Sequence, residues 1–162
     1  MSTQKICVGS PTRRRRHYRY VDFALTAELV AAAQQRAVEL GDRELAPPVP
    51  LERCDRNTVE LALAKPQAAF EGVERYPSLA AKTAALLYGL AKSQACPDGN
   101  KRIALIVVIA FLRINGFNLR VRREEMAETI LRVAESRSEE HDVTIQELTE
   151  WFEARIDGEE NV

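Results

Sequence analysis

Residues 98–102, which read Asp-Gly-Asn-Lys-Arg, combine residue types that can bind phosphate. They directly precede an apolar run, residues 103–112, whose composition is typical of a buried helix. The N–H groups in the first turn of a helix lack intrahelical partners and carry partial positive charge, so they hold anions. Arg102 can donate two hydrogen bonds to phosphate oxygens, and Asp98 can hold a magnesium ion that bridges them. The segment therefore predicts a phosphate site at the start of a buried helix.

Each residue of this segment has its own expected role. The backbone N–H groups of Gly99, Asn100 and Lys101 surround the phosphate, and the Asn100 amide braces the loop or contacts phosphate itself. Arg102 binds the same group and neutralises its charge, while Asp98 is the metal ligand. The alternative is a plain helix start with an acid and a polar turn.

The segment from Gln94 to Arg102 resembles the signature loop of the Fic/Doc (Fido) family, which reads His-x-Phe-x-Asp/Glu-Gly/Ala-Asn-Gly/Lys-Arg. Lys101 matches the Doc-like form of that loop. Four other segments also look like the Doc branch: residues 62–70, 76–79, 84–90 and 111–116. The resemblance covers about residues 55–120. It implies an all-α, single-domain Fido helical bundle with a buried central helix and a small β-hairpin flap near residues 69–77.

The resemblance also implies an activity. Doc-like proteins with a lysine at the position of Lys101 transfer the γ-phosphate of ATP to a protein hydroxyl, whereas the glycine form permits transfer of a whole nucleotide. ATP and Mg²⁺ are the implied cofactors, and Gln94, Asp98 and Arg102 occupy the catalytic positions. The implied partners are a protein target such as a translation factor and an antitoxin or regulatory peptide in the groove, as in a toxin–antitoxin pair. The flap would pair with the backbone of the target peptide.

Gln94 departs from the family pattern at the position of the base. A general base near pH 7 needs a pKa within a few units of 7, which histidine supplies and an amide does not. Gln94 can still orient a hydroxyl or water by hydrogen bonding. Loss of base assistance alone lowers a rate by about 10²–10⁴-fold. Three functions stay open: a weakened Doc-like toxin, an inactive pseudoenzyme that binds nucleotide or a partner, and an altered enzyme acting on a small phosphate-containing substrate.

Substitute bases are few in this sequence. His17 follows four arginines, and His141 lies in an acidic stretch, so both are predicted to be solvated surface residues. Cys96 stands where the family has phenylalanine. It is predicted to pack inward, and it would be a nucleophile only with a lowered pKa.

The composition predicts one helical domain. The chain has 162 residues, 46% apolar and 29% charged, with only seven glycines. A basic arm over residues 1–19, the Fido domain over 20–157 and an acidic tail over 158–162 are the expected divisions. The first expected helix covers residues 25–40, the second runs from a capping box at 57–60 to before Pro66, and the third runs from a Ser78 cap to about residue 93. The fourth runs from the motif to Asn115, with Gly116 as its C-terminal cap. A fifth helix is expected to start at Glu124, and a sixth at a capping box over residues 144–147.

Charge and cysteine content indicate the surroundings of the protein. Residues 1–20 carry a net charge of +6, and residues 124–162 carry −10. Because no groove-reading motif accompanies the arginines at 13–16, nucleic acid is an unlikely partner, and the acidic third is a candidate to attract them. Cys7, Cys54 and Cys96 show no pairing or zinc pattern and are predicted to be unpaired. The absence of a membrane-length apolar run and of a secretion signal favours the cytoplasm.

Overall fold

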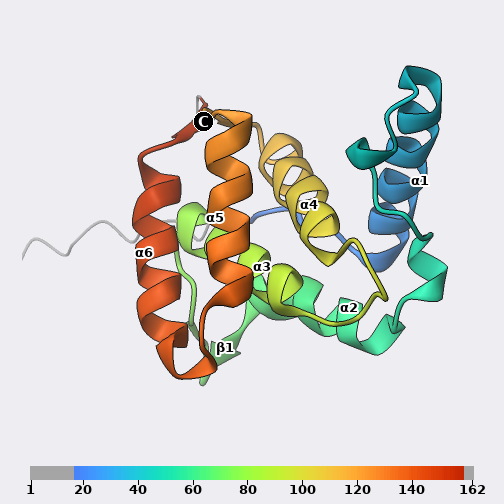
Figure 1. Cartoon of the computed structure of the whole chain (residues 1–162). Coiled ribbons are helices and arrows are strands. Elements are labelled where there is room, and N and C mark those ends of the chain that lie inside the picture. Colours follow the sequence, from blue (N-terminus) through green and yellow to red (C-terminus); the bar gives the residue numbers. More distant parts are fainter. Residues whose placement is uncertain (1–16, 159–162) are drawn as a thin grey trace, which may run out of the picture.

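The structure, a computed structural model, describes residues 17–158 and is predominantly helical (Figure 1). Six α-helices and two small two-stranded sheets make up the described part. The expected all-α bundle with a small hairpin is thus confirmed. The α-helices are α1 (Phe23–Leu40), α2 (Arg56–Ala64), α3 (Leu79–Lys92), α4 (Asn100–Ile114), α5 (Arg123–Glu135) and α6 (His141–Glu153). Short 3-10 turns are η1 (Arg43–Leu45), η2 (Leu51–Arg53), η3 (Lys65–Gln67) and η4 (Ser138–Glu140).

Polar side chains cap several helices where the sequence indicates. The Ser78 hydroxyl accepts a hydrogen bond from the N–H of Ala81 at 3.0 Å, which opens α3 as predicted. Gly116, at φ 86°, follows the end of α4, also as predicted. The start of α2 differs from the prediction, because Asp55 and not Asn57 caps it, accepting from the N–H of Thr58 at 2.8 Å.

The last helix begins three residues earlier than its predicted capping box. Helix α6 starts at His141, directly after η4, and no side-chain cap forms at Thr144. The His141 ring packs edge-on against Tyr88 of α3, with ring centroids 4.7 Å apart. This tertiary contact fixes the first turn of α6, and a capping pattern in the sequence does not reveal it.

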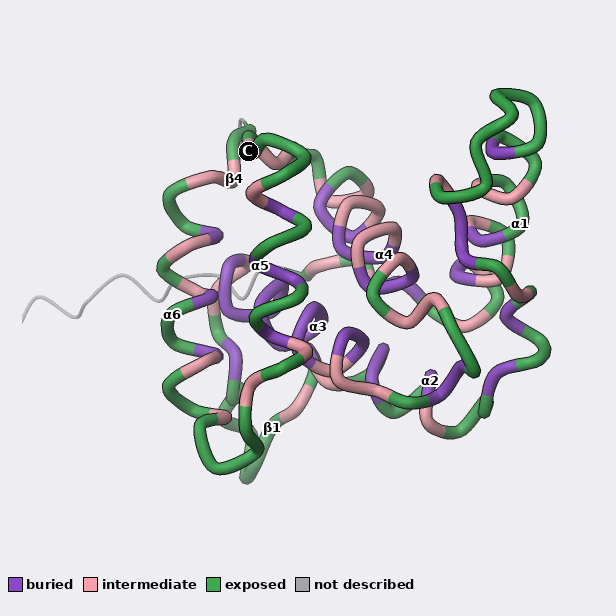
Figure 2. Tube along the Cα trace, viewed as in Figure 1, coloured by how far each residue is buried: buried purple, intermediate pink, exposed green. Residues whose placement is uncertain are grey.

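Helix α3 is the most deeply buried element. It packs against α2, α4, α5 and α6, and eleven of its fourteen residues are buried. Figure 2 shows α3 almost entirely in the colour of buried residues, whereas α4 is buried along one face and partly open along the other. Helices α5 and α6 cover one side of α3, and α1 lies on the opposite side of the molecule, next to α2 and α4 (Figure 1).

Two short sheets complete the described fold. Strands β1 (Ala69–Phe70) and β2 (Val73–Glu74) pair antiparallel and form the predicted hairpin, with both strands exposed. Strands β3 (Asn118–Leu119) and β4 (Ile156–Asp157) pair the segment after α4 with the segment after α6. The second pair was not anticipated, since two-residue strands leave no alternation in a sequence.

The prediction of unpaired cysteines is wrong for two of the three. Cys54 and Cys96 form a disulfide, with their Cα atoms 4.3 Å apart. Helices α2 and α3 run out and back, so residue 96 returns to residue 54, and the N–H of Asp55 donates to the carbonyl of Ala95 at 2.7 Å. The spacing of the cysteines along the chain does not reveal this return. Cys7 lies outside the described residues.

Most of the predicted basic arm and acidic tail, residues 1–16 and 159–162, also lies outside the described residues. The described end of the arm contacts the bundle, because the Asn115 side chain bonds both the N–H and the carbonyl of Arg19, at 2.8 and 2.9 Å. His17 is exposed, as predicted. Within residues 17–158, no helix has the length and apolar character needed to cross a bilayer.

Candidate phosphate-binding site

The motif loop comprises residues 94–99. It ends at Gly99, which directly precedes Asn100, the first residue of α4. Gly99 has φ 87°, in the left-handed region, and a Cβ at this position would lie 2.9 Å from Cδ of Pro48. No side chain caps the first turn of α4. Because the N–H groups of that turn have no intrahelical acceptors, they present the positive end of the helix at the loop.

Asn100 braces this loop, as one of its two predicted roles required. Its amide oxygen accepts from the N–H of Cys96 at 3.1 Å, and its amide nitrogen donates to the Cys96 carbonyl at 2.9 Å. The Cys96 side chain is held in turn by the disulfide to Cys54. The prediction that Cys96 packs inward is confirmed, since it is only 5% exposed. Two hydrogen bonds from Asn100 and one disulfide therefore hold the middle of the loop at Cys96.

The charged side chains around the loop differ in their exposure and in their hydrogen bonds to the protein. Arg102 donates from one guanidinium nitrogen to the carbonyl of Ala46 at 3.1 Å, which anchors it to the segment before α2 and leaves its other donors available. Lys101 is exposed. Asp98 is exposed, and one of its carboxylate oxygens accepts the N–H of Gly99 at 2.6 Å. That amide, assigned to the phosphate in the sequence prediction, is therefore already engaged.

Gln94 is exposed at the start of the loop, and within residues 17–158 its side chain has no hydrogen-bond partner. Its amide is therefore free to bind a ligand or water. It has no group that titrates near neutral pH.

These residues fit a nucleotide phosphate with magnesium. The uncapped first turn of α4 supplies N–H donors, and Arg102 retains free donors. The second carboxylate oxygen of Asp98 is available to a hard cation. The described residues contain no cluster of three or more metal-binding side chains, so protein ligands would leave most coordination positions to phosphate and water.

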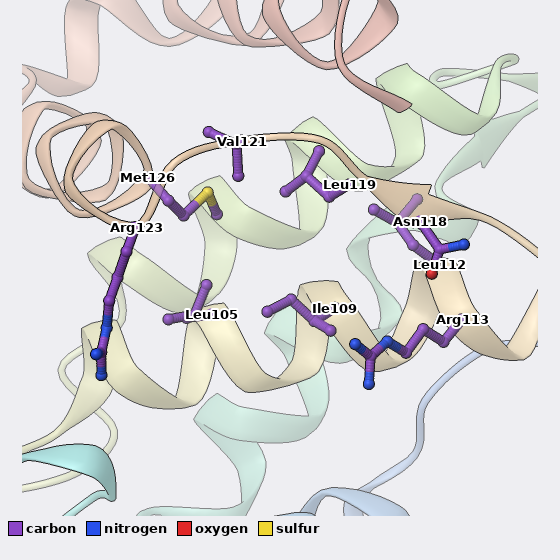
Figure 3. Close-up of a pocket in the computed structure, with 9 residues that line it drawn as sticks. All are labelled: Leu105, Ile109, Leu112, Arg113, Asn118, Leu119, Val121, Arg123 and Met126. Atoms are coloured by element: carbon purple, nitrogen blue, oxygen red, sulfur yellow. The ribbon is translucent and has the colours of Figure 1, made fainter. Parts of the chain in front are cut away.

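A groove of about 340 Å³ lies between α4 and the segment from β3 to the start of α5 (Figure 3). Its floor is apolar, and Arg113 and Arg123 lie at its edges. Figure 3 shows Leu105 and Ile109 of α4 directed toward the segment that carries Leu119, Val121 and Met126. Its chemistry suits an apolar segment with acidic flanks.

A group that sequence reasoning missed lies beside the hairpin. We call it the flap cluster: Lys65, Arg75, Tyr88, His141 and Asp142. The Lys65 ammonium lies 3.2 Å from Nε2 of His141, whose Nδ1 lies 2.8 Å from Asp142. The Lys65 ammonium also lies over the Tyr88 ring, at 4.6 Å. The prediction that His141 is a solvated surface residue is wrong, since its side chain is 23% exposed.

The contacts of the flap cluster indicate which ring nitrogen of His141 donates and which accepts. An ammonium group only donates, so Nε2 accepts from Lys65 and Nδ1 carries the proton toward Asp142. Burial, followed by repulsion from Arg75, lowers the pKa of Lys65, and the hydrogen bond from His141 is the largest effect lowering the pKa of Asp142. With both ring nitrogens engaged, His141 does not offer a free base.

Lys82 of α3 anchors the hairpin from below. Its side chain is 1% exposed, and its ammonium donates to the carbonyl of Pro66 and to the carboxylate of Glu74 in β2, both at 3.2 Å. Tyr76, which follows the hairpin, is packed into the core and is 3% exposed. The hairpin is therefore fixed at its base while its strands stay exposed.

An all-α bundle with a small exposed hairpin is the architecture that the sequence resemblance implied. The model of the Fic/DOC family matches residues 24–112, which is more than half of the chain. The protein belongs to the Fic/DOC family.

Comparison with characterised proteins places it near the Doc branch. Over 65 residues the chain is 48% identical to "Toxin Doc" of Mycolicibacterium smegmatis. That alignment covers 40% of this chain and 50% of the relative, so the chain spans about half the length of the curated relative it matches. No solved structure matches the chain.

Proposed function

We propose that this protein is a Doc-like toxin-family protein that binds the phosphates of ATP with Mg²⁺ at residues 98–102. The observation that carries the proposal is the uncapped first turn of α4 behind Gly99, with Asp98 and Arg102 on either side. Asp98 would hold the metal. The N–H groups of Asn100 and Lys101 and the free donors of Arg102 would bind phosphate oxygens.

The reaction that this geometry suits is transfer of a phosphoryl group from ATP to a protein hydroxyl, with nucleotidyl transfer as the alternative. A loose transition state of this kind depends more on positioning and charge neutralisation than on proton removal. Gln94 can orient the attacking hydroxyl but cannot take its proton, so the rate is expected to be low. The exposed edges of the hairpin are the surface on which a target segment would lie.

An antitoxin segment is the proposed regulatory partner, because the relative at 48% identity is described as a toxin. The groove between α4 and the β3–α5 segment is its proposed seat. The apolar floor would accept one face of an amphipathic helix, and Arg113 and Arg123 would pair with acidic residues beside that face. The cytoplasm is the proposed location, since ATP and a translation factor are found there.

The second candidate is a pseudoenzyme that binds nucleotide without turnover. The exposure of Gln94, whose amide cannot act as a base, favours this function, and the engagement of both ring nitrogens of His141 removes one of the two histidines considered as substitutes. The third, an altered enzyme that acts on a small phosphate-containing substrate, requires turnover without a strong base.

Titration calorimetry with ATP and Mg²⁺, paired with transfer of radiolabelled phosphate to proteins of a cell lysate, separates these functions. The natural chain, Gln94→His and Arg102→Ala are compared. The toxin function predicts binding with weak transfer by the natural chain, transfer at least about a hundredfold faster in Gln94→His, and neither in Arg102→Ala.

Two results would redirect the proposal. Binding without transfer by the natural chain, together with activity in Gln94→His, identifies a pseudoenzyme. Turnover that Gln94→His leaves unchanged and Arg102→Ala abolishes favours the altered enzyme. An ATP affinity that Arg102→Ala and Asp98→Ala do not change contradicts the phosphate site itself.

A further inference from the structure

The disulfide between Cys54 and Cys96 connects the motif loop to the base of α2. Cys54 ends the η2 turn and directly precedes Asp55, the residue that caps α2. Cys96 lies in the middle of the motif loop, and both its backbone N–H and its carbonyl bond the side chain of Asn100, the first residue of α4. One covalent bond therefore sets the distance between α2 and the loop that begins the phosphate site.

We propose that this disulfide is a redox-sensitive clamp, in which Cys54 and Cys96 are positioning residues for the motif loop. The clamp itself is independent of the bound ligand, whereas its effect on ATP rests on the proposed function. Disulfides inside cells are uncommon and usually transient or redox-sensing. A buried disulfide that fixes a ligand-binding loop is suited to such sensing, because the loop conformation then follows the oxidation state.

The chemistry is a two-electron thiol–disulfide exchange with a dithiol. A thiolate of the reductant attacks one sulfur of the pair, and the S–S bond breaks as the other cysteine leaves as a thiolate and takes up a proton. The second thiol of the reductant then displaces the mixed disulfide, which gives two cysteine thiols and an oxidised reductant. Glutathione disulfide reverses the reaction by the same steps. Because Cys54 is 8% and Cys96 5% exposed, exchange is expected to require local opening and to be slow.

Reduction removes the only covalent restraint on the loop. The Asn100 bonds and the hydrogen bond from Asp55 to Ala95 remain, and these can open without breaking a covalent bond. When the binding-competent conformation is populated only in part, the apparent dissociation constant rises by the inverse of that fraction. A loop that is competent about a tenth of the time gives about a tenfold weaker affinity for ATP with Mg²⁺.

Hydrogen–deuterium exchange of the full chain without nucleotide tests the clamp directly. The natural protein is compared after treatment with glutathione disulfide and with dithiothreitol, beside Cys54→Ser. Cys7→Ser, which retains the pair, is the matched control. Reduction is expected to accelerate exchange of the amides in residues 94–102 about tenfold or more in the natural chain and in Cys7→Ser. Cys54→Ser should exchange like the reduced protein in both conditions, and amides of α5 should not respond.

Exchange in residues 94–102 that is equal in the two oxidation states would overturn the clamp, as would an acceleration of similar size throughout α5. Reduction of the natural chain needs no substitution, so misfolding of Cys54→Ser leaves the test intact. Calorimetry with ATP and Mg²⁺ then measures the consequence. Unchanged affinity on reduction refutes control of binding by the clamp. Absence of ATP binding in both states refutes the proposed function alone, and the exchange result still decides the clamp.

Discussion

The motif loop and the flap cluster both gather polar side chains beside α3, but these side chains are exposed in the loop and bond one another in the cluster. In the loop, the backbone is fixed by Asn100 and the disulfide, while Gln94 and Lys101 extend into solvent without protein partners in the described chain. In the flap cluster, Lys65, His141 and Asp142 bond one another. Binding capacity is therefore expected where the backbone is rigid and the side chains are uncommitted.

The largest predicted effect breaks the fixed backbone of the loop. Replacing Cys54 and Cys96 together by serine removes a crosslink between residues 42 positions apart. Loop entropy in the unfolded chain predicts a loss of about 4 kcal/mol in the free energy of unfolding. Urea unfolding of the oxidised natural protein and the double variant measures the loss, with Cys7→Ser as the control. A difference below about 1 kcal/mol would show that the crosslink does not constrain the unfolded chain as this account requires.

Lys82 is the corresponding anchor on the flap side, and its removal is the second largest effect. Lys82→Ala leaves the Pro66 carbonyl without its donor and removes a buried side-chain stem, for a predicted loss of about 3 kcal/mol in stability. Lys82→Met keeps the stem and should lose about half as much. Urea unfolding compares the three proteins. Equal losses in the two variants would mean that the hydrogen bonds and not the packing hold the hairpin.

The contrast between the two regions also explains what sequence reasoning can reach. The motif loop is contiguous, so its residue types and its position before an apolar run predicted the helix start and the brace at Asn100. The Ser78 and Gly116 caps are equally local signals and were predicted as well. The disulfide joins residues 42 positions apart, and the contact between Lys65 and His141 in the flap cluster joins residues 76 positions apart. Their proximity depends on how α2, α3 and α6 pack, and neither charge nor spacing along one chain encodes that packing.

Asn100 provides the third test, because its side chain braces the loop and its own N–H belongs to the proposed phosphate site. Asn100→Ala leaves the N–H and carbonyl of Cys96 without partners, for a predicted loss of about 2 kcal/mol in stability. ATP affinity should fall in the same variant, since the loop loses its non-covalent brace. Urea unfolding and calorimetry measure the two effects. Asn100→Asp, which keeps an acceptor for the Cys96 N–H, should lose less stability. A stable Asn100→Ala protein with reduced ATP affinity would instead indicate direct contact with phosphate.

The smallest predicted effect concerns Tyr76, beside the hairpin, and is a gain in the free energy of unfolding instead of a loss. The Tyr76 hydroxyl is buried and has no hydrogen-bond partner among the described residues. Tyr76→Phe should therefore raise the free energy of unfolding by about 1 kcal/mol at pH 8, because an unsatisfied buried hydroxyl is removed. A loss of stability instead would show that the hydroxyl has a partner, such as bound water.

The same variant carries a pH dependence. Burial is the main cause that raises the pKa of Tyr76 above 10.0 in the folded protein. A raised folded-state pKa means that the unfolded chain releases the proton first, so the stability contributed by the neutral phenol is complete below pH 10 and is lost as the pH rises through the folded-state pKa. Urea unfolding at pH 8 and pH 11 should therefore show a larger alkaline loss for the natural protein than for Tyr76→Phe. Equal losses would place the alkaline sensitivity elsewhere, with Tyr88, whose pKa burial also raises, as the next residue to replace.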